Sequence, residues 1–313
     1  MHLRAISALA LGLGLGLGAG CGGTLSNDDI AFIEAVPRKD ALHVNVPARS
    51  AQALSALGQA DVFVTAQNIA AGVNGGLDGV LGLLDFIRGV SPSTRSELAR
   101  TWGPWAQAEH PGIEYQVVMN RELDAKGDLY RFRYSLNARR APAGYLPIID
   151  GYFYGAQAKS GSGSLNIEFD NSHALGINQP NDPLKPMDIQ YDFTGDPRTL
   201  DLNLGRNADG GFGLSAFDYG YAIYRDGHGL FDYAFPDGKG NLFTVQTWFT
   251  TTAAGKALID VVHPPFFEDR VTECWDGTLS LTFISDPASV VSQCSGVAAP
   301  CVLGSAASCP NLP

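Results

Sequence analysis

Residues 189–193 read Ile-Gln-Tyr-Asp-Phe, and residues 217–223 read Phe-Asp-Tyr-Gly-Tyr-Ala-Ile. In both stretches apolar and polar side chains alternate, which is typical of antiparallel strands with one buried and one exposed face. The same period of two recurs over residues 113–284, between turn signals such as Asp226-Gly227 and Asp276-Gly277. The pattern predicts an antiparallel meander of about ten strands.

The predicted sheet has an apolar face that needs a cover. Apolar residues with helical spacing precede the sheet, and they are Leu77, Val80, Leu81, Leu84 and Ile87. A second helix is predicted over residues 61–71, separated from the first by Asn74-Gly75-Gly76, and a short one over residues 93–100. We therefore expect a mainly β fold with N-terminal helices (α+β), in which the meander curls into a barrel or half-barrel with the helices on its concave apolar face.

The domain organisation is predicted from composition. The expected parts are a signal peptide over residues 1–20, a flexible tether over 21–28, a β-meander domain over 29–286 with a helical segment over 51–100, and a C-terminal tail over 287–313. No linker or change of composition divides the long central part, so we expect it to be one domain.

Composition argues against one class of function. The 313 residues are 45% hydrophobic, which is enough for a packed core, and the formal net charge is −11. No cluster of Lys and Arg interrupts the acidic balance, so we expect no binding to nucleic acid. An acidic surface on an exported protein usually serves solubility.

The first twenty residues have the features of an export signal. Arg4 is followed by an apolar run over residues 5–17 and by Gly18-Ala19-Gly20, which directly precedes Cys21. The apolar run is too short to span a membrane stably. We expect the signal to be removed, either just before Cys21 or by ordinary cleavage near Ala19.

A Cys directly after small residues resembles the lipobox of bacterial lipoproteins. In that family pattern a large aliphatic residue lies three positions before the Cys, whereas here Leu17 lies four positions before Cys21. The resemblance implies that Cys21 becomes an acylated first residue, carrying chains such as palmitate, and ties the protein to a membrane without spanning it. Gly22 stands where an Asp implies inner-membrane retention, so the resemblance implies the outer membrane, with a periplasmic or surface-exposed domain.

Four further cysteines lie near the C-terminus. They are Cys274, Cys294, Cys301 and Cys309. An even number in an exported chain, without Cys-x-x-Cys spacing, predicts two disulfides rather than a zinc site. Three pairings are possible. We favour Cys274 with Cys294 and Cys301 with Cys309, which ties the tail to the sheet.

Two tryptophan motifs bound the predicted sheet. Trp102-Gly103-Pro104-Trp105 precedes it, and Glu273-Cys274-Trp275-Asp276 introduces its last strand. With these motifs and the lipobox, the chain resembles a group of exported myxobacterial lipoproteins that have no assigned activity. The resemblance extends over most of the mature chain, is loose between the motifs, and implies location only.

Aromatic residues are the candidate ligand-binding residues. They are Trp102, Trp105, Tyr191, Tyr219 and Tyr221. On an open apolar face they form a platform for a ligand; the alternative is that the tryptophans are core residues closing the two ends of the sheet.

No catalytic or metal site is predicted. The chain has no Gly-x-Ser-x-Gly motif and no pair of histidines with metal-ligand spacing. Residues 207–211 and 226–229 combine Asp with Gly, but they lack the spacing of calcium loops and fit hairpin turns better. We expect no cofactor.

Three hypotheses of function remain. The first is a non-catalytic envelope lipoprotein with a binding or structural role, such as a carrier or sensor of an apolar ligand on a half-barrel similar to the carriers that localise bacterial lipoproteins. The second is an exported hydrolase of polysaccharide or lipid that uses carboxylates in a cleft. The third is a surface adhesin or glycan-binding module with exposed aromatics, for which Trp248 and Tyr224 are candidates.

Overall fold

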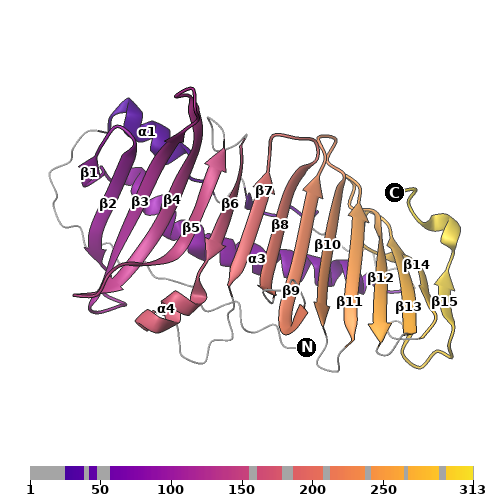
Figure 1. Ribbon diagram of the computed structural model, residues 1–313. Helices are drawn as coiled ribbons and strands as arrows, with labels where there is room; N and C mark the ends of the chain where they lie inside the picture. The colour runs from indigo at the N-terminus through magenta and orange to yellow at the C-terminus, as the bar shows by residue number, and fades with distance from the viewer. Residues whose placement is uncertain are drawn as a thin grey trace. The chain divides into compact units, whose positions relative to one another are not determined.

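The computed structural model describes residues 25–38, 42–47, 57–154, 161–177, 186–206, 212–236, 241–263, 267–288 and 294–312. The predicted signal peptide, Cys21 and the first part of the tether lie outside these ranges. The described chain is mainly β, with one antiparallel sheet of fifteen strands and few helices (Figure 1). No helix in these ranges is both long enough and apolar enough to cross a membrane.

The elements follow one another along the chain. The helices are α1 (Asn27–Glu34), α3 (Asp61–Asp85) and α4 (Phe169–Leu175), with 3-10 turns η1 (Phe86–Gly89) and η3 (Ala306–Ser308). The strands are β1 (Thr94–Arg95), β2 (Ala99–Ala106), β3 (Ile113–Leu123), β4 (Leu129–Arg140), β5 (Leu146–Tyr154), β6 (Ser162–Ile167), β7 (Met187–Asp192), β8 (Arg198–Arg206), β9 (Phe212–Ile223), β10 (Gly229–Pro236), β11 (Leu242–Phe249), β12 (Gly255–His263), β13 (Phe267–Trp275), β14 (Leu281–Asp286) and β15 (Cys301–Gly304).

Each strand lies beside the next strand of the chain, so the predicted antiparallel meander is confirmed. The sheet begins at β1, ends at β15 and does not close, so of the predicted barrel or half-barrel the closed barrel is wrong. Helices bury the apolar face here, and closure is not needed to keep it from water. The predicted number of about ten strands is too low.

Two of the additional strands, β1 and β2, occupy residues predicted as a short helix and a tryptophan motif. Gly103-Pro104 argues against a strand in the sequence, because proline has no N–H for the ladder. The register shifts between Trp102 and Trp105, and this irregularity lets β2 continue past the proline. Another additional strand, β15, lies in the predicted tail.

The described residues form two compact units. Unit 1 comprises the described residues up to His43 and those within 72–194, which include α1, β1 to β7 and α4. Unit 2 comprises those within 44–71 and from Gly195 onward, which include β8 to β15. The first eleven residues of α3 belong to unit 2 and the rest of α3 to unit 1.

Helix α3 is continuous over the predicted break at Asn74-Gly75-Gly76, so the prediction of two helices is wrong. Its core side chains are Phe63, Ala66, Ile69, Ala70, Val73, Leu77, Leu81 and Leu84, all at most 8% exposed. This apolar stripe passes through the break, and its burial outweighs the cost of about 1 kcal/mol for a glycine in a helix. The predicted stripe residues Leu77, Leu81, Leu84 and Ile87 are buried, and the side chain of Val80 lies outside the description.

Helix α1 is held to the sheet of unit 1 by a buried ion-pair network. Ser26 and Asp29 cap its first turn reciprocally, so helix begins within the predicted tether. The Asp29 carboxylate is fully buried and accepts hydrogen bonds from Arg100 at 2.6 Å and Arg95 at 3.1 Å. The guanidinium of Arg100 also contacts Asp28 and lies 4.7 Å from the ring centre of Phe32.

The network shifts the acidity of its carboxyls. Burial raises the pKa of Asp29, but hydrogen bonds from Ser26, Arg100 and Arg95 outweigh it and hold that pKa well below its usual range. A hydrogen bond from Arg121 lowers the pKa of Asp28, against a smaller opposing effect of burial. Both carboxyls are therefore charged at neutral pH and stabilise the docked helix.

The C-terminal part of unit 2 contains both disulfides. They join Cys274 to Cys309 and Cys294 to Cys301, so the favoured pairing is wrong although two disulfides are confirmed. The tail adds β15 to the sheet beside β14, and η3 then turns the chain back towards β13. This return brings Cys309 to Cys274 and leaves Cys294 to close the loop that precedes β15.

Replacement of Asp29 by Asn tests the buried network. We expect Asp29→Asn to lower the free energy of unfolding by about 3 kcal/mol at pH 7, because the buried guanidinium of Arg100 loses its buried carboxylate and keeps only the half-exposed Asp28. Asp260→Asn is the control: its ion pair with Arg270 is solvent-exposed, so the loss should stay below about 1 kcal/mol. Urea denaturation measures both.

The pH dependence of the Asp29→Asn effect has a defined sign. A depressed folded-state pKa gives stability that is present above the unfolded pKa of about 3.9 and is lost as pH falls through the folded value. The difference in free energy of unfolding between the natural chain and Asp29→Asn should thus be constant over pH 5–7 and shrink only in stronger acid. Equal stabilities at pH 7 would contradict this account.

Candidate functional site

The sheet of unit 1 has one face that contributes nothing to the core. Along β4, Phe132, Tyr134 and Leu136 are buried while Arg133 and Ser135 between them are not. The same alternation holds in β5, β6 and β7. We call the side of β4 to β7 that carries Arg133 the outer face.

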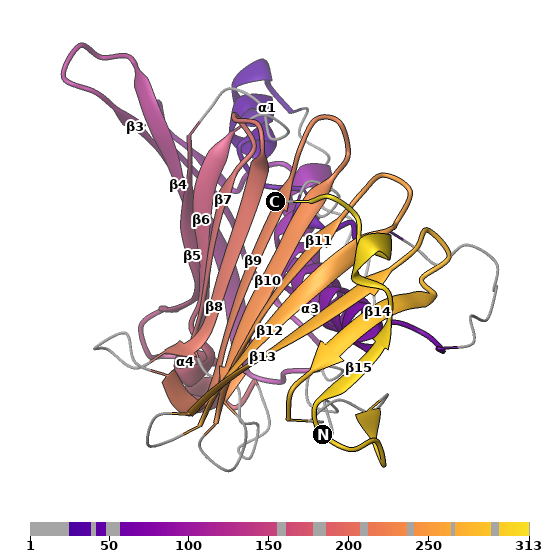
Figure 2. The ribbon, with the colours of Figure 1, turned by 90° about the vertical axis from the view of Figure 1, so that its right-hand side faces the viewer.

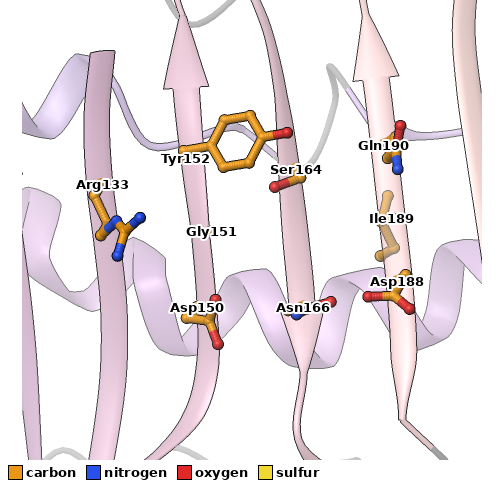
Figure 3. Close-up of a pocket in the computed structure, with 9 residues that line it drawn as sticks. All are labelled: Arg133, Asp150, Gly151, Tyr152, Ser164, Asn166, Asp188, Ile189 and Gln190. Carbon is orange, nitrogen blue, oxygen red and sulfur yellow. The ribbon is translucent and has the colours of Figure 1, made fainter. Parts of the chain in front are cut away.

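A shallow hollow of about 290 Å³ lies on this outer face (Figure 3). Its lining residues are Arg133, Asp150, Gly151, Tyr152, Ser164, Asn166, Asp188, Ile189 and Gln190. Strand register arranges the polar ones in two cross-strand rows. One row is Asp150, Asn166 and Asp188, and the other is Arg133, Tyr152, Ser164 and Gln190. Because neighbouring strands are about 4.8 Å apart, Asp150 and Asp188 are roughly 10 Å apart at their backbones.

Two glycines and two tyrosines hold the strands beneath the hollow. A Cβ on Gly151 would lie 2.7 Å from the hydroxyl of Tyr134, and one on Gly163 would lie 2.5 Å from the hydroxyl of Tyr191. Each ring thus covers a glycine of the adjacent strand on the core side. The Tyr134 hydroxyl also donates to the backbone carbonyl of Ser164 at 2.9 Å. Gly151 pairs in register with Tyr134 of β4 and Leu165 of β6.

The hollow is acidic. Burial raises the pKa of Asp150; the charge of Arg133 opposes this shift and that of Asp188 adds to it. Burial likewise raises the pKa of the adjacent Glu168, as do the charges of Asp150, Asp188 and Asp170. Arg133 is the one cationic side chain among the lining residues. The electrostatics favour a neutral or cationic ligand over an anionic one.

A cluster of three tyrosines borders the hollow. The ring centres of Tyr152 and Tyr154 are 5.1 Å apart, and those of Tyr154 and Tyr130 are 5.3 Å apart. Glu122 pairs with Arg131 and Leu123 with Leu129, so Tyr130 is the extra residue of a β-bulge. The guanidinium of Arg131 lies 5.4 Å from the ring centres of both Tyr130 and Tyr152. Tyr152 therefore links this tyrosine cluster to the hollow.

The structure does not bring the five predicted ligand-binding aromatics together. Trp102, Tyr191, Tyr219 and Tyr221 are core residues, at most 7% exposed. The indole N–H of Trp102 donates to the carbonyl of Val90 at 2.9 Å. Trp105 is half-buried and stacks on Tyr115. Trp102, Trp105 and Tyr191 belong to unit 1, and the other two belong to unit 2.

The two aromatics proposed for the outer surface are half-buried in unit 2. Trp248 has the ammonium of Lys256 5.3 Å from its ring centre, and Tyr224 stacks on His228 in the turn after β9. Neither lines the hollow. Sequence reasoning missed the hollow because its residues come from four strands, and only the strand register reveals that they form adjacent rows.

The described residues contain no group of three or more His, Cys, Asp or Glu placed to hold a metal ion. Cys21, the predicted lipid attachment site, lies outside the description. Comparisons with protein-family models, with curated proteins and with solved structures gave no match.

Glu273, one of the buried carboxyl residues of unit 2, caps a helix. Glu273 is fully buried, and its Oε1 accepts a hydrogen bond from the backbone N–H of Val62 at 3.1 Å, in the first turn of α3. Burial raises the pKa of Glu273 to about 8; this N–H opposes the shift and the charge of Asp61 adds to it. The carboxyl is therefore mostly protonated at pH 7 while it caps the helix.

Glu273 makes the stability of the fold depend on pH. Its folded pKa is raised, so its contribution is full below the unfolded pKa of about 4.3 and is lost as pH rises through about 8. Between these values we expect the free energy of unfolding of the natural chain to fall by up to about 1.4 kcal/mol per pH unit relative to Glu273→Gln. Glutamine keeps an acceptor for Val62 without titrating. If urea denaturation gave the same change in free energy of unfolding from pH 5 to 8 for both proteins, this role of Glu273 would be excluded.

Proposed function

We propose that this protein is a lipid-anchored envelope protein that binds a glycan, without catalysis, on the outer face of β4 to β7. The observation that carries the proposal is the hollow itself, where hydrogen-bonding side chains from four strands lie in register beside a tyrosine ring. This is the glycan-binding alternative of the sequence hypotheses, moved from the aromatics of unit 2 to unit 1.

The chemistry of a sugar matches that of the hollow. A hydroxyl group both donates and accepts hydrogen bonds, and the hollow offers carboxylates as acceptors, amides as both, and a guanidinium as donor. The apolar C–H side of a sugar ring packs on an aromatic ring, for which Tyr152 is placed at the border of the hollow. An open, shallow site suits the side of a polysaccharide chain rather than a small enclosed ligand.

Charge narrows the class of glycan. Asp150, Asp188 and the adjacent Glu168 outweigh the single guanidinium of Arg133. Glycans rich in uronic acid or phosphate would meet repulsion there. The expected ligand is thus a polymer of neutral sugars or amino sugars.

The proposed location is the outer membrane, through acylated Cys21. Two disulfides support an oxidising compartment outside the cytoplasm. The lipobox-like segment supports acylation of Cys21, and Gly22 supports the outer membrane, as the sequence resemblance implies. In this setting a glycan of the envelope, or of a neighbouring cell, is within reach of the domain.

A hydrolase is the second candidate, because two carboxyls of the hollow differ in environment. Asp150 has a raised pKa, as a general acid requires, and Asp188 lies in the same cross-strand row with Asn166 between them. The carrier of an apolar ligand has less support. The tyrosines expected to line its site, Tyr191, Tyr219 and Tyr221, are packed in the core.

Glycan binding is tested on an array of neutral, amino-sugar and uronic-acid polymers, followed by titration of the best ligand. Asn166→Ala and Gln190→Ala should each weaken binding about tenfold, since each removes hydrogen bonds worth about 1 kcal/mol. Gln246→Ala is the matched control, because Gln246 is an exposed strand glutamine of unit 2 outside the hollow. It should leave affinity unchanged.

The outcomes separate the candidates. Equal loss in Gln190→Ala and Gln246→Ala, or no binding to any neutral or amino-sugar polymer, contradicts the proposal. Release of reducing ends that disappears in Asp150→Asn would make the protein a hydrolase instead.

A further inference from the structure

Exposed apolar side chains gather at one end of unit 1. The described chain has eleven large hydrophobic residues that are at least 36% exposed, and six of them lie on or just before α1, on the β1–β2 turn and on the β3–β4 hairpin. These six are Leu25, Ile30, Leu98, Leu123, Leu129 and Tyr130. We call them the apolar end.

The β3–β4 hairpin forms the most prominent part of the apolar end. Figure 2 shows it extending beyond the ends of the neighbouring strands, on the side of unit 1 where α1 lies. Leu123 and Leu129 are cross-strand partners next to the turn and are 42% and 46% exposed. Tyr130, at 50%, is the bulge residue beside them. A projecting hairpin with exposed leucines is unfavourable in water alone, which indicates a surface that it contacts.

The Asp124 side chain stabilises the turn of the β3–β4 hairpin from within. The Asp124 carboxylate accepts hydrogen bonds from the backbone N–H groups of Lys126 at 2.8 Å and Asp128 at 3.0 Å. Lys126 is exposed at the turn between Asp124 and Asp128, so the turn has a small net negative charge and the apolar side chains, not charge, favour lipid contact.

The predicted anchor, Cys21, is close in sequence to the same end. Two contacts hold helix α1 at this end of unit 1. Asp28 of α1 contacts Arg121 of β3, and the backbone N–H of Arg121 donates to the carbonyl of Leu98 at 2.8 Å. Leu25 is four residues from Cys21, and four residues span at most about 14 Å. An acylated Cys21 would therefore keep Leu25, a residue of the apolar end, within about 14 Å of the bilayer surface.

We propose that the apolar end contacts the lipid bilayer and orients the anchored protein on it. The inference rests on the acylation of Cys21 proposed above. The occupant is lipid rather than a protein partner, since the tether would hold Leu25 within about 14 Å of the membrane and so keep lipid beside the apolar end. Leucines and a tyrosine at a hairpin tip enter the headgroup and upper acyl region, where a tyrosine has both an apolar and a hydrated neighbour.

This orientation also has a consequence for the hollow. Arg133 lies three residues along β4 from Tyr130, which is about 10 Å of strand. In this orientation the hollow would lie near the membrane surface. The expected ligand is then a glycan that is presented close to a bilayer.

The test uses the full chain purified from membranes and reconstituted into phosphatidylethanolamine and phosphatidylglycerol vesicles with brominated acyl chains. Tryptophan is introduced at the apolar end by Leu129→Trp, and in unit 2 by Val302→Trp, a site 57% exposed on β15. Bromine quenches only tryptophan that reaches the acyl region. We expect the fluorescence added by Leu129→Trp to be quenched at least about twofold more than that added by Val302→Trp.

Mass spectrometry of the N-terminal peptide reports acylation separately from these readouts. With Cys21 acylated, equal quenching of the two variants overturns the proposal, and a lipid-independent dimer that Leu123→Asp/Leu129→Asp disrupts would show that a second copy is the occupant. If Cys21 is not acylated, vesicle flotation of the natural chain decides: a bound fraction that falls about tenfold in Leu123→Asp/Leu129→Asp supports lipid contact, and no bound fraction overturns it. Glycan titration without vesicles tests the proposed function independently.

Discussion

Burial of the apolar face of the sheet by helices is the interaction on which the rest of the structure depends. In unit 2 the ring of Phe63, from the first turn of α3, packs 4.8 Å from Trp275 and 6.4 Å from Phe249. In unit 1 Phe32 of α1 packs 5.3 Å from Phe132. Aromatic contacts of this kind stabilise the fold beyond their buried area. Because the core lies on this side, side chains on the opposite face of the strands are not needed for packing.

That freedom explains where a binding site can form. A sheet covered on one side presents a row of side chains every second residue on the other side, and the strand register fixes their spacing. On β5, β6 and β7 the rows contain Asp, Asn, Gln and Tyr, whose polar groups converge on one hollow. The core side supports this arrangement, because the Tyr134 and Tyr191 rings occupy the space above Gly151 and Gly163.

The period of two predicted the strands well because it reports which side chains are buried. It underestimated their number where local chemistry opposed the tertiary outcome, as at Gly103-Pro104 in β2. The opposite error occurred at Asn74-Gly75-Gly76. Local propensity predicts a helix break there, but the continuous buried stripe of α3 overrides it. Propensity is a weak prior when burial is extensive.

Features that depend on distant residues could not be read from the sequence. The pairing of Cys274 with Cys309 follows from β15 joining the sheet, which no local pattern announces. Asp150, Asn166 and Asp188 are separated along the chain by loops and a helix, and only their register places them in one row. The predicted aromatics were sought as ligand contacts, but large rings are the residues that a core buries first.

The anchor, the apolar end and the hollow form one account of how the protein works. An acyl chain at Cys21 would hold unit 1 at the membrane, the hairpin of β3 and β4 would set its orientation, and the outer face would then be presented to glycans near the surface. The apolar end and the hollow adjoin at the tyrosine cluster, because Tyr130 belongs to the apolar end and Tyr152 lines the hollow.

A crystal structure of the protein with the tightest-binding neutral or amino-sugar oligosaccharide tests the central claim most directly. The account predicts a sugar ring over β5, β6 and β7, with its hydroxyls bonded to Asn166 and Gln190 and its C–H side against Tyr152. A sugar bound on unit 2, or any ligand enclosed between α3 and the apolar face of the sheet, would contradict it.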